Sequence, residues 1–434
     1  MSKNDLIPVM SESVVMSVVL PTYNEEKNIV KVLDSMYYQK TDNGIFDRNL
    51  YEIIIVDNNS TDNTIELVTD YLLKHDDLNL CITEEKKQGV AWARKTGMDL
   101  ASKRSHQRDF RTEQVQPLYI CSADADCKVD ETWLFHLKQT MDDTKAAIGV
   151  CNYYYPKEHF CQREKLWTVI EQILRARDVT FKIFGGFPDG KGFAATRECY
   201  DKIDGIEIFY QLKNGKFLCH LSDDWDFGIK ARAMGFDIVY SPDSKVEINP
   251  RRVDNEIDRT INGLSYGEDG IITMRDIRPL QPKESNSDLT KIEARTMWEY
   301  AIKDFTPKNI ILPLMLTTDF FKNDDVIAFL GDEFAAKLEK RIAEIKQEMS
   351  VKNFAPIHLY KTPSFRLYME FKDELFEVMR THIGEDVGHA PPLPPCLQEI
   401  EKHDELNLKD FIYYYCEDRE SGEAHNYFGN GGVF

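Results

Sequence analysis

The sequence has no CxxC pair among its nine cysteines, and this absence excludes a zinc ribbon. The cysteines are scattered along the chain, and Cys81, Cys121 and Cys151 stand inside apolar runs. Buried cysteines of this kind are small core residues in proteins of a reducing compartment. The pattern therefore also excludes a disulfide framework and favours a cytoplasmic protein.

Long apolar runs are absent as well. The longest candidate, residues 310–316, is far shorter than the about 20 residues that a membrane-spanning helix needs. The start of the chain, MSKNDLIPVM, lacks the basic-then-apolar layout of a signal peptide. We therefore expect a soluble protein without a transmembrane segment.

Basic residues are in short supply, because 54 Lys and Arg face 74 Asp and Glu and leave a net charge of -20. Such a charge repels DNA, RNA and anionic lipid, and the basic clusters, at residues 84–87 and at Arg251 and Arg252, are short. Nucleic-acid binding is therefore not expected. The 434 residues, 42% of them apolar, are sufficient for two units with sizeable cores.

The first part of the chain alternates strand and helix patterns. Residues 14–20 (VVMSVVL) form an apolar β-branched run that ends at Pro21, and Ile29, Val32, Leu33 and Met36 then fall on one helix face. The same cycle predicts strands at 53–56, 80–82 and 118–122, a helix whose face carries Ile65, Val68 and Leu72, a helix around 90–101, a polar loop at 102–114, and a later strand at 238–240. This alternation predicts a doubly wound, mostly parallel α/β sheet.

The alternation breaks near Tyr153. A helix at 166–184, a Gly-rich loop at 185–192 and mixed segments follow, and helical patterns at 326–349 and 364–383 come later, with a Pro-rich break at 390–395. We predict one domain at 1–280, with a nucleotide-binding half at 14–150 and an acceptor half at 151–280. A mainly helical C-terminal domain is predicted at 281–434, either to form a homo-oligomer or to grip an acceptor.

Polar clusters follow three of the predicted strands, at residues 21–25 (PTYNE), 57–60 (DNNS) and 124–126 (DAD). In a doubly wound sheet the ligand lies outside the carboxyl ends of the strands, so these clusters are candidate ligand sites. Helix capping is the competing interpretation of the first two clusters, because Asn, Ser, Thr and Asp satisfy free N–H groups there.

Asp124 and Asp126 are the sharpest signal. Two carboxylates crowded at the end of a buried strand repel each other unless a cation or hydrogen bonds compensate. Oxygen ligands of this kind suit Mg²⁺ or Mn²⁺, commonly together with phosphate oxygens. The alternative is a pair of acids on a surface loop.

Five motifs in order, VVLPTYNEE, IIIVDNNSTDNT, GVAWARKTG, SADAD and SDDWDFGIKARAMG, resemble those of the family 2 glycosyltransferases. The resemblance covers residues 14–252. It implies the GT-A fold, a nucleotide-binding α/β domain joined to an acceptor-binding half. The expected fold class is thus α/β of the GT-A type, with a mostly parallel sheet followed by a mainly helical C-terminal domain.

The resemblance also implies roles for single residues. It implies that Asp126 coordinates the metal and that Asp124 lies near the ribose and the metal's waters. The residues expected to bind the donor are Pro21, Tyr23 and Glu25 along the nucleotide, Asp57 at the base, Arg94 near base or diphosphate, and Lys191 of the Gly-rich loop near phosphate. The metal then acts as a Lewis acid on the diphosphate leaving group. For Lys191 the alternative is an ordinary loop residue. Arg251 and Arg252 could close over the diphosphate, and the alternative for them is a solvated basic pair.

The general base is expected from Asp223 and Asp224. These acids open a predicted helix with Trp225 and Ile229 on one face, so N-terminal capping is the competing interpretation. The resemblance assigns the base to the second acid, Asp224. One carboxylate base without a second carboxylate nucleophile favours inversion, and retention stays an alternative.

The sequence thus predicts an enzyme that transfers a sugar from a nucleotide-sugar donor, a UDP-sugar first, to an acceptor hydroxyl. The acceptor, a carbohydrate, a lipid-linked molecule or a small molecule, is left open. A sugar nucleotidyltransferase would start with a Gly-rich segment where this chain has PTYNEE, and a regulatory or scaffold protein would lack one acid cluster. Many family members carry Asp-Asp or Asp-Gly where this chain has Asp57 and Asn58. Aromatic residues (Tyr153 to Tyr155, Trp167, Trp225 and Tyr413 to Tyr415) fit either acceptor walls or core packing.

Overall fold

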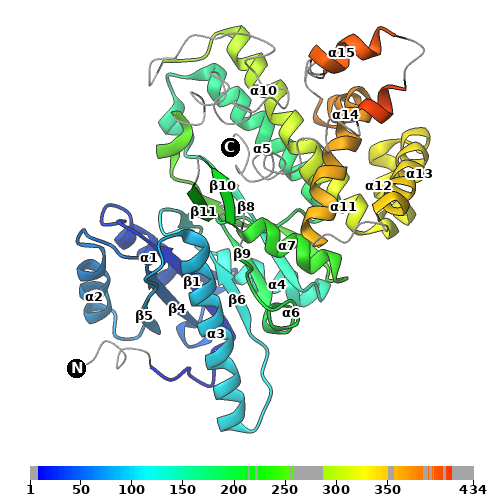
Figure 1. The fold of residues 1–434 in the computed structure, drawn as a ribbon. Helices are drawn as coiled ribbons and strands as arrows, with labels where there is room; N and C mark the ends of the chain where they lie inside the picture. The colour runs from blue at the N-terminus through cyan, green and yellow to red at the C-terminus, as the bar shows by residue number, and fades with distance from the viewer. Residues whose placement is uncertain are drawn as a thin grey trace. The chain divides into compact units, whose positions relative to one another are not determined.

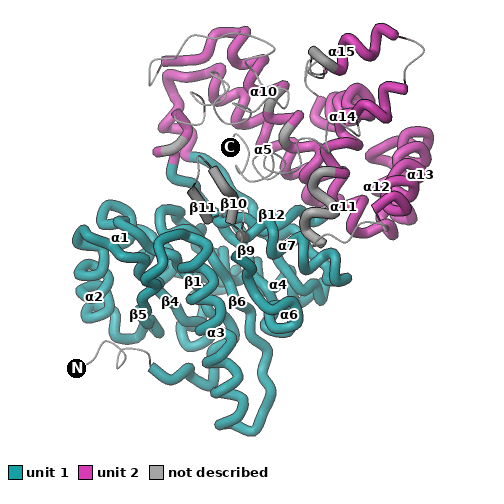
Figure 2. The backbone as a smooth tube through the Cα atoms, viewed as in Figure 1, with its two compact units in different colours: residues 1–155, 185–210, 217–249 teal, residues 156–184, 211–216, 250–434 magenta. Residues whose placement is uncertain are grey.

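The chain forms two compact units in the computed structural model, each of them drawn in its own colour in Figure 2. The sheet unit comprises residues 1–155, 185–210 and 217–249, and the helical unit comprises residues 156–184, 211–216 and 250–434. The structure describes residues 8–208, 210–213, 216–219, 223–254, 257, 287–349, 356–384, 390, 393, 395–403 and 407–412. The domain boundary predicted at residue 280 lies outside the described residues and stays a prediction.

The sheet unit is built on an eight-stranded sheet of order β5-β4-β1-β6-β9-β8-β12-β7 among the described residues (Figure 1). The strands β5, β4, β1 and β6 are parallel, β9 runs antiparallel to both β6 and β8, and β12 is parallel to β8. The bounds are β1 Met16–Thr22, β4 Tyr51–Asp57, β5 Leu80–Glu84, β6 Tyr119–Ser122, β7 Lys128–Val129, β8 Ile148–Tyr154, β9 Phe193–Thr196 and β12 Ile238–Glu247. The predicted parallel sheet is confirmed, with β9 and β7 as its antiparallel members.

The helices of the sheet unit are α1 Ile29–Tyr37, α2 Thr64–Lys74, α3 Val90–Thr112, α4 Trp133–Thr144, α6 Arg197–Lys202 and α7 Asp223–Ala233. The predicted apolar face of α1 is confirmed, because all four of its residues are buried. The long helix α3 packs closely on the sheet at Gly97, where a Cβ would stand 2.3 Å from Val19 and 2.7 Å from Val56. The small hairpin β2 Lys40–Thr41 with β3 Gly44–Ile45 completes the sheet unit, and a second hairpin, β10 Tyr210–Lys213 with β11 Lys216–Cys219, is divided between the units, since residues 211–216 belong to the helical unit.

Pro21 does not end the first strand, as the sequence had suggested, because β1 continues through it to Thr22. The central strand tolerates proline at this point because β6 pairs with β1 only from Met16 to Val19. Beyond that point β1 has a single neighbour, β4, with Pro21 opposite Val56. A proline without an N–H group costs little where one side of the strand has no partner.

The polar loop predicted at 102–114 is wrong, since α3 runs on to Thr112. Three of the charged residues that suggested a loop, Arg104, Arg108 and Asp109, are buried and paired. The guanidinium of Arg104 donates to both carboxylate oxygens of Glu52 at 2.8 Å and to the carbonyl of Pro8 at 2.8 Å. Arg108 donates to the carbonyl oxygens of Val14 and Gln116. This extension of α3 therefore fastens the segment that leads into β1, and its cost of charge burial is offset by ion pairs.

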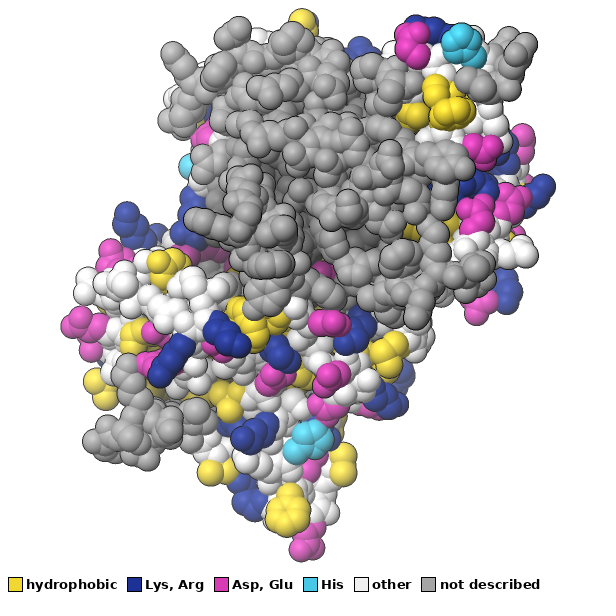
Figure 3. Space-filling view, in the orientation of Figure 1, with side chains coloured by type: hydrophobic (Ala, Val, Ile, Leu, Met, Phe, Trp, Pro, Cys, Tyr) yellow, Lys and Arg dark blue, Asp and Glu magenta, His cyan; other side chains and the backbone are white. Residues whose placement is uncertain are grey.

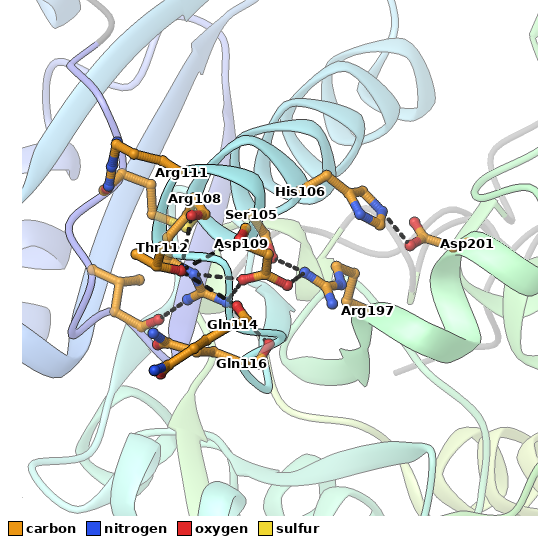
Figure 4. A network of polar contacts seen from close by, with 12 residues as sticks. Ser105, His106, Arg108, Asp109, Arg111, Thr112, Gln114, Gln116, Arg197 and Asp201 are labelled. Atoms are coloured by element: carbon orange, nitrogen blue, oxygen red, sulfur yellow. Dashed lines mark hydrogen bonds and ion pairs between the residues drawn. The ribbon is translucent and has the colours of Figure 1, made fainter.

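Asp109 is the centre of a second set of contacts on this extension, drawn in Figure 4. Arg108 donates to its Oδ1 through Nε at 3.0 Å and Nη2 at 2.9 Å, and Arg197 donates to its Oδ2 at 2.6 Å. Burial alone would raise the pKa of Asp109, but the bonds from Arg197 and Arg108 outweigh burial and lower it. Nearby, His106 contacts Asp201 at 2.7 Å, which also ties α3 to α6.

Asp109→Asn is expected to lower the free energy of unfolding by about 2 kcal/mol at neutral pH, the worth of a hydrogen bond to a charged group. A carboxyl whose pKa is lower in the folded state stabilises the fold above its ordinary pKa, and this stabilisation is lost as the pH falls through the folded value. The difference in Tm between wild type and variant should therefore narrow below about pH 4. Thermal melts across pH test this, with Asp70→Asn on the exposed side of α2 as control. A difference that is constant with pH would contradict it.

The helical unit confirms the predicted mainly helical C-terminal region. Its elements are α5 Glu164–Phe184, α10 Lys291–Thr306, the π-helical turn Pro307–Ile311, α11 Leu312–Leu316, α12 Asp324–Leu330, α13 Asp332–Met349, α14 Pro356–Ile383 and α15 Pro395–Glu401, with 3₁₀ turns at Lys157–Phe160, Pro250–Arg252 and Thr318–Lys322. The helix predicted at 326–349 is divided at Gly331, whose φ of 81° interrupts it. The helix predicted at 364–383 lies within α14, which kinks at Phe371.

The burial predicted for the cysteines that stand inside apolar runs is confirmed. Cys81, Cys121 and Cys151 are buried with free thiols. Within the described part of the chain, every helix is too short or too polar to cross a lipid bilayer. On the face drawn in Figure 3, the basic side chains of the sheet unit stand among acidic ones.

Candidate active site

The carboxyl ends of β1 and β4 hold the first two polar clusters side by side. Thr22 lies opposite Asp57 in the register, and the loops that follow are joined by bonds from the Asn24 N–H to Ser60 Oγ at 3.1 Å and from the Thr61 N–H to Asn24 Oδ1 at 2.8 Å. Four predicted donor-binding residues are thereby collected at one edge of the sheet, namely Pro21, Tyr23, Glu25 and Asp57. Tyr23 is 48% exposed, so its ring is accessible to a ligand.

Capping of α2 is not the main task of the Asp57 cluster. The Oδ1 atom of Asp57 accepts from the Ser60 N–H at 3.0 Å, within the loop. Asn58, which is buried, donates to the carbonyl oxygens of Glu85 and Lys87 and accepts from the Gly89 N–H at 2.8 Å. Asn58 thus fixes the loop that leads into α3, a role that the sequence did not reveal.

The acid pair after β6 stands where the sequence placed it. Asp124 and Asp126 are half-buried, and together with Cys127 they offer ligand atoms that all lie within 4.8 Å of one another. Two carboxylates at this spacing fit an oxygen-ligated divalent cation. Cys127 was not predicted as a member of this group; burial, then Asp124 and Asp126, raise the pKa of its thiol.

Arg94, on the second turn of α3, is the central cation of this region and is almost fully buried, at 2% exposure. Its Nη2 donates to Asp124 Oδ1 at 3.0 Å and its Nε donates to Ser122 Oγ at 3.1 Å. Its Nη1 lies 3.9 Å from Asp224 Oδ2. The structure therefore brings Arg94, Asp124 and Asp224 together, from α3, the end of β6 and the start of α7.

Asp224 lies in the first turn of α7, as predicted, and its side chain is 14% exposed. Its Oδ1 accepts from the Trp225 N–H at 2.7 Å, and its Oδ2 faces Arg94. One oxygen of Asp224 thus accepts from the backbone at the start of α7, and the other forms an ion pair with Arg94. The side chain of Asp223 lies outside the described residues.

The Gly-rich loop at 185–192 is closely packed within the sheet unit. Gly185 has a φ of 78°, and a Cβ there would stand 2.1 Å from the carbonyl of Ile238. A Cβ at Gly190 would stand 2.8 Å from both Arg94 Nη2 and Asp124 Oδ1. Lys191 follows at once; its ammonium lies 4.7 Å from the centre of the Tyr153 ring and opposes the rise in the pKa of Cys127. The loop therefore adjoins the acid pair.

The remaining sequence candidates are placed as follows. Tyr153 and Tyr155 are buried in the core, and Trp225 is half-buried with its ring 4.9 Å from that of Phe187. Arg251 is exposed. Trp167 belongs to the helical unit, and the side chain of Arg252 and the run Tyr413 to Tyr415 lie outside the described residues.

Comparison with known proteins locates the relatives of this sheet unit. Residues 17–199 match the family model described as "Glycosyl transferase family 2". Glycosyltransferase AglE from Haloferax volcanii is 30% identical over 142 residues, which make up 32% of this chain and 40% of that protein. A "Dolichyl N-acetyl-alpha-D-glucosaminyl phosphate 3-beta-D-2,3-diacetamido-2,3-dideoxy-beta-D-glucuronosyltransferase" from Methanococcus voltae is 37% identical over 75 residues, 17% of this chain and 22% of that protein. The chain spans less than half the length of these curated relatives.

Among solved structures, the chain is similar to mannosyltransferase PcManGT from Pyrobaculum calidifontis in complex with GDP-Man and Mn²⁺. The TM-score is 0.39 at 15% identity, and the match covers 86% of this chain and 87% of that chain.

A mostly parallel sheet with an acid pair after one strand and a further acid at a helix start is an α/β arrangement of the GT-A type, which confirms the predicted fold class. The match to the glycosyltransferase family 2 model over residues 17–199 confirms, for that segment, the resemblance that the motifs indicated.

Proposed function

We propose that this protein transfers a sugar from a nucleotide-sugar donor to an acceptor hydroxyl with inversion at the sugar. The observation that carries the proposal is that Arg94 contacts acids of two elements, Asp124 of the acid pair after β6 through Nη2 and Asp224 of α7, whose Oδ2 lies 3.9 Å from Nη1. The acid pair suits a metal and a diphosphate, and Asp224 suits a base. The match to the family model supports the nucleotide-sugar donor.

The donor occupies the edge formed by the loops after β1, β4 and β6. Tyr23 and Asp57 contact the nucleoside, Pro21 and Glu25 line the same edge, and Lys191 contacts phosphate. Asp124 and Asp126 would hold Mn²⁺ or Mg²⁺, which would supply Lewis-acid neutralisation of the diphosphate leaving group. Arg94 adds fixed positive charge beside Asp124.

Asp224 acts as the general base. Its carboxylate is 14% exposed, so an acceptor hydroxyl reaches it while most of the surrounding water is excluded. The carboxylate takes the proton of that hydroxyl as the oxygen attacks the anomeric carbon, and the bond from that carbon to the diphosphate oxygen breaks. A single base with no second carboxylate as nucleophile gives inversion.

The acceptor is proposed as lipid-linked. The name of the Methanococcus voltae relative describes a glucuronosyltransferase that acts on a dolichyl-linked sugar phosphate. The 37% identity over the matched segment supports testing lipid-linked acceptors first. Soluble carbohydrate acceptors are the comparison arm of the same assay.

A thermal-shift screen tests the donor half of the proposal. We expect UDP, assayed beside GDP, dTDP and CMP, to raise Tm with Mn²⁺ present and to lose most of that shift in EDTA, because a ligand that binds the folded state stabilises it. At a ligand concentration of about 100 times Kd the gain is about 2.7 kcal/mol. A shift with a different nucleotide would replace UDP as the donor class. No shift with any nucleotide would contradict the transferase proposal and favour a regulatory protein, and release of pyrophosphate from a nucleoside triphosphate and a sugar phosphate would favour a nucleotidyltransferase.

A further inference from the structure

Arg94 contacts both halves of the proposed chemistry at once. Its Nη2 donates to Asp124 Oδ1 at 3.0 Å, on the metal side, and its Nη1 stands 3.9 Å from Asp224 Oδ2, on the base side. A third contact, from Nε to Ser122 Oγ at 3.1 Å, fixes the plane of the guanidinium against the end of β6. A planar guanidinium is suited to such a position because its donors point in several fixed directions.

The exposed fractions of Arg94, Asp124 and Asp224 indicate that the guanidinium lies beneath the two carboxylates that it contacts. Arg94 is 2% exposed, whereas the side chain of Asp124 is 34% exposed and that of Asp224 is 14% exposed. The backbone at Gly190 covers the guanidinium closely, since a Cβ there would stand 2.8 Å from Nη2. A ligand above the sheet edge therefore meets the carboxylates and not the arginine that orients them.

The positive charge of Arg94 has opposite effects on a metal bound at Asp124 and on the carboxylate of Asp224. A cation beside Asp124 repels a divalent metal and competes with it for the same carboxylate oxygen. The same cation attracts the carboxylate of Asp224, whose Oδ2 lies 3.9 Å from the guanidinium, and so helps to orient it. Metal affinity and base alignment are thus both set by one buried side chain.

We propose that Arg94 is a positioning residue that links the metal-side carboxylate Asp124 to the base Asp224, weakening metal binding while it aligns the base. This inference rests on the proposed function and deepens it. It differs from the role expected from the family motif, in which Arg94 contacts the nucleotide base or the diphosphate.

The test measures Mn²⁺ affinity and turnover in the same variants. Arg94→Gln should tighten the Kd for Mn²⁺, read from the electron paramagnetic resonance signal of free Mn²⁺, by about tenfold and lower kcat by about tenfold, the sizes expected for loss of one charged neighbour. Arg94→Lys should restore the wild-type Kd, because it restores the charge. It should not restore kcat, because an ammonium on a shorter stem does not reach both carboxylates.

Arg104→Gln is the matched control. Arg104 is also a buried arginine of α3 paired with a carboxylate, that of Glu52, and it lies outside the proposed site. Its variant should lower Tm and leave both the Kd for Mn²⁺ and kcat unchanged.

If the wild type binds Mn²⁺ and transfers sugar, weaker or unchanged Mn²⁺ binding in Arg94→Gln would overturn the linking role. An unchanged kcat in that variant would also overturn it. If Arg94→Gln does not fold, Arg94→Lys decides: kcat close to the wild-type value would overturn the role. A wild type that neither binds Mn²⁺ nor transfers sugar would instead overturn the proposed function, and this role with it.

Discussion

Asp224→Asn is expected to lower kcat by at least about 100-fold, the lower end of what a general base contributes, while the KM for the donor stays near the wild-type value. The amide keeps the size of the side chain and the contact to the Trp225 N–H, which the Asp224 Oδ1 now accepts at 2.7 Å. It lacks the negative charge and the basicity that take the proton of the acceptor hydroxyl. Steady-state kinetics with the donor found in the nucleotide screen measure both constants.

Asp224→Ser separates the base from a mere helix cap. Serine is a good residue for a helix start and accepts an N–H there, so a variant with serine keeps that contact but has no carboxylate. We expect Asp224→Ser to fold with a Tm near that of wild type and to be as inactive as Asp224→Asn. Turnover near the wild-type rate in the serine variant would show that Asp224 serves as a cap and would move the base elsewhere.

Strands β1 and β4 were predictable from local pattern alone, since the apolar β-branched runs at 14–20 and 53–56 are typical of buried parallel strands, whereas β8 and β9 were not predicted. The helix α1 was equally clear, because its four apolar positions repeat with helical spacing and all are buried. The buried residues of each of these elements follow a simple local pattern, an apolar run in the strands and helical spacing in α1, so the sequence alone reveals them. The polar clusters at the strand ends followed from the same strands.

The end of α3 was not predictable because its stability comes from partners distant in sequence. Arg104 meets Glu52, and Arg197 meets Asp109, so charged residues typical of a loop are buried in a helix. No window around residue 104 contains this information. Tertiary pairing therefore overrides the local signal.

In the candidate site, too, some features were predictable from the sequence and others were not. The positions of Asp57, Asp124, Asp126 and Asp224 were recognisable from motifs, because each stands just after a strand or at a helix start. The approach of Arg94 to Asp224 joins residues 130 positions apart, and sequence spacing does not encode such a contact. The same holds for Asn58 and the loop before α3, whose bond depends on the register of β4 beside β5.

Asp126→Ala is expected to abolish metal-dependent donor binding. Asp126 lies with Asp124 and Cys127 in a group whose ligand atoms are within 4.8 Å of one another, and the variant removes a carboxylate that, in the proposed site, would hold the metal directly. The Kd for Mn²⁺ should rise by more than the about 10- to 100-fold that loss of an outer-shell partner costs. The nucleotide should then give the same small shift in Tm with Mn²⁺ as in EDTA.

Asp143→Ala, which removes an exposed carboxylate from α4, is the control for the change in net charge. It should leave the Kd for Mn²⁺ and the metal-dependent shift unchanged, because exposed charges act weakly and are screened by salt. If Asp126→Ala binds the nucleotide as tightly as wild type and with the same dependence on Mn²⁺, the acid pair after β6 does not hold the metal. If wild type binds the nucleotide equally well in EDTA, the donor half of the reaction relies on fixed charges such as Arg94 and Lys191, and Asp126 would then serve the loop and not the leaving group.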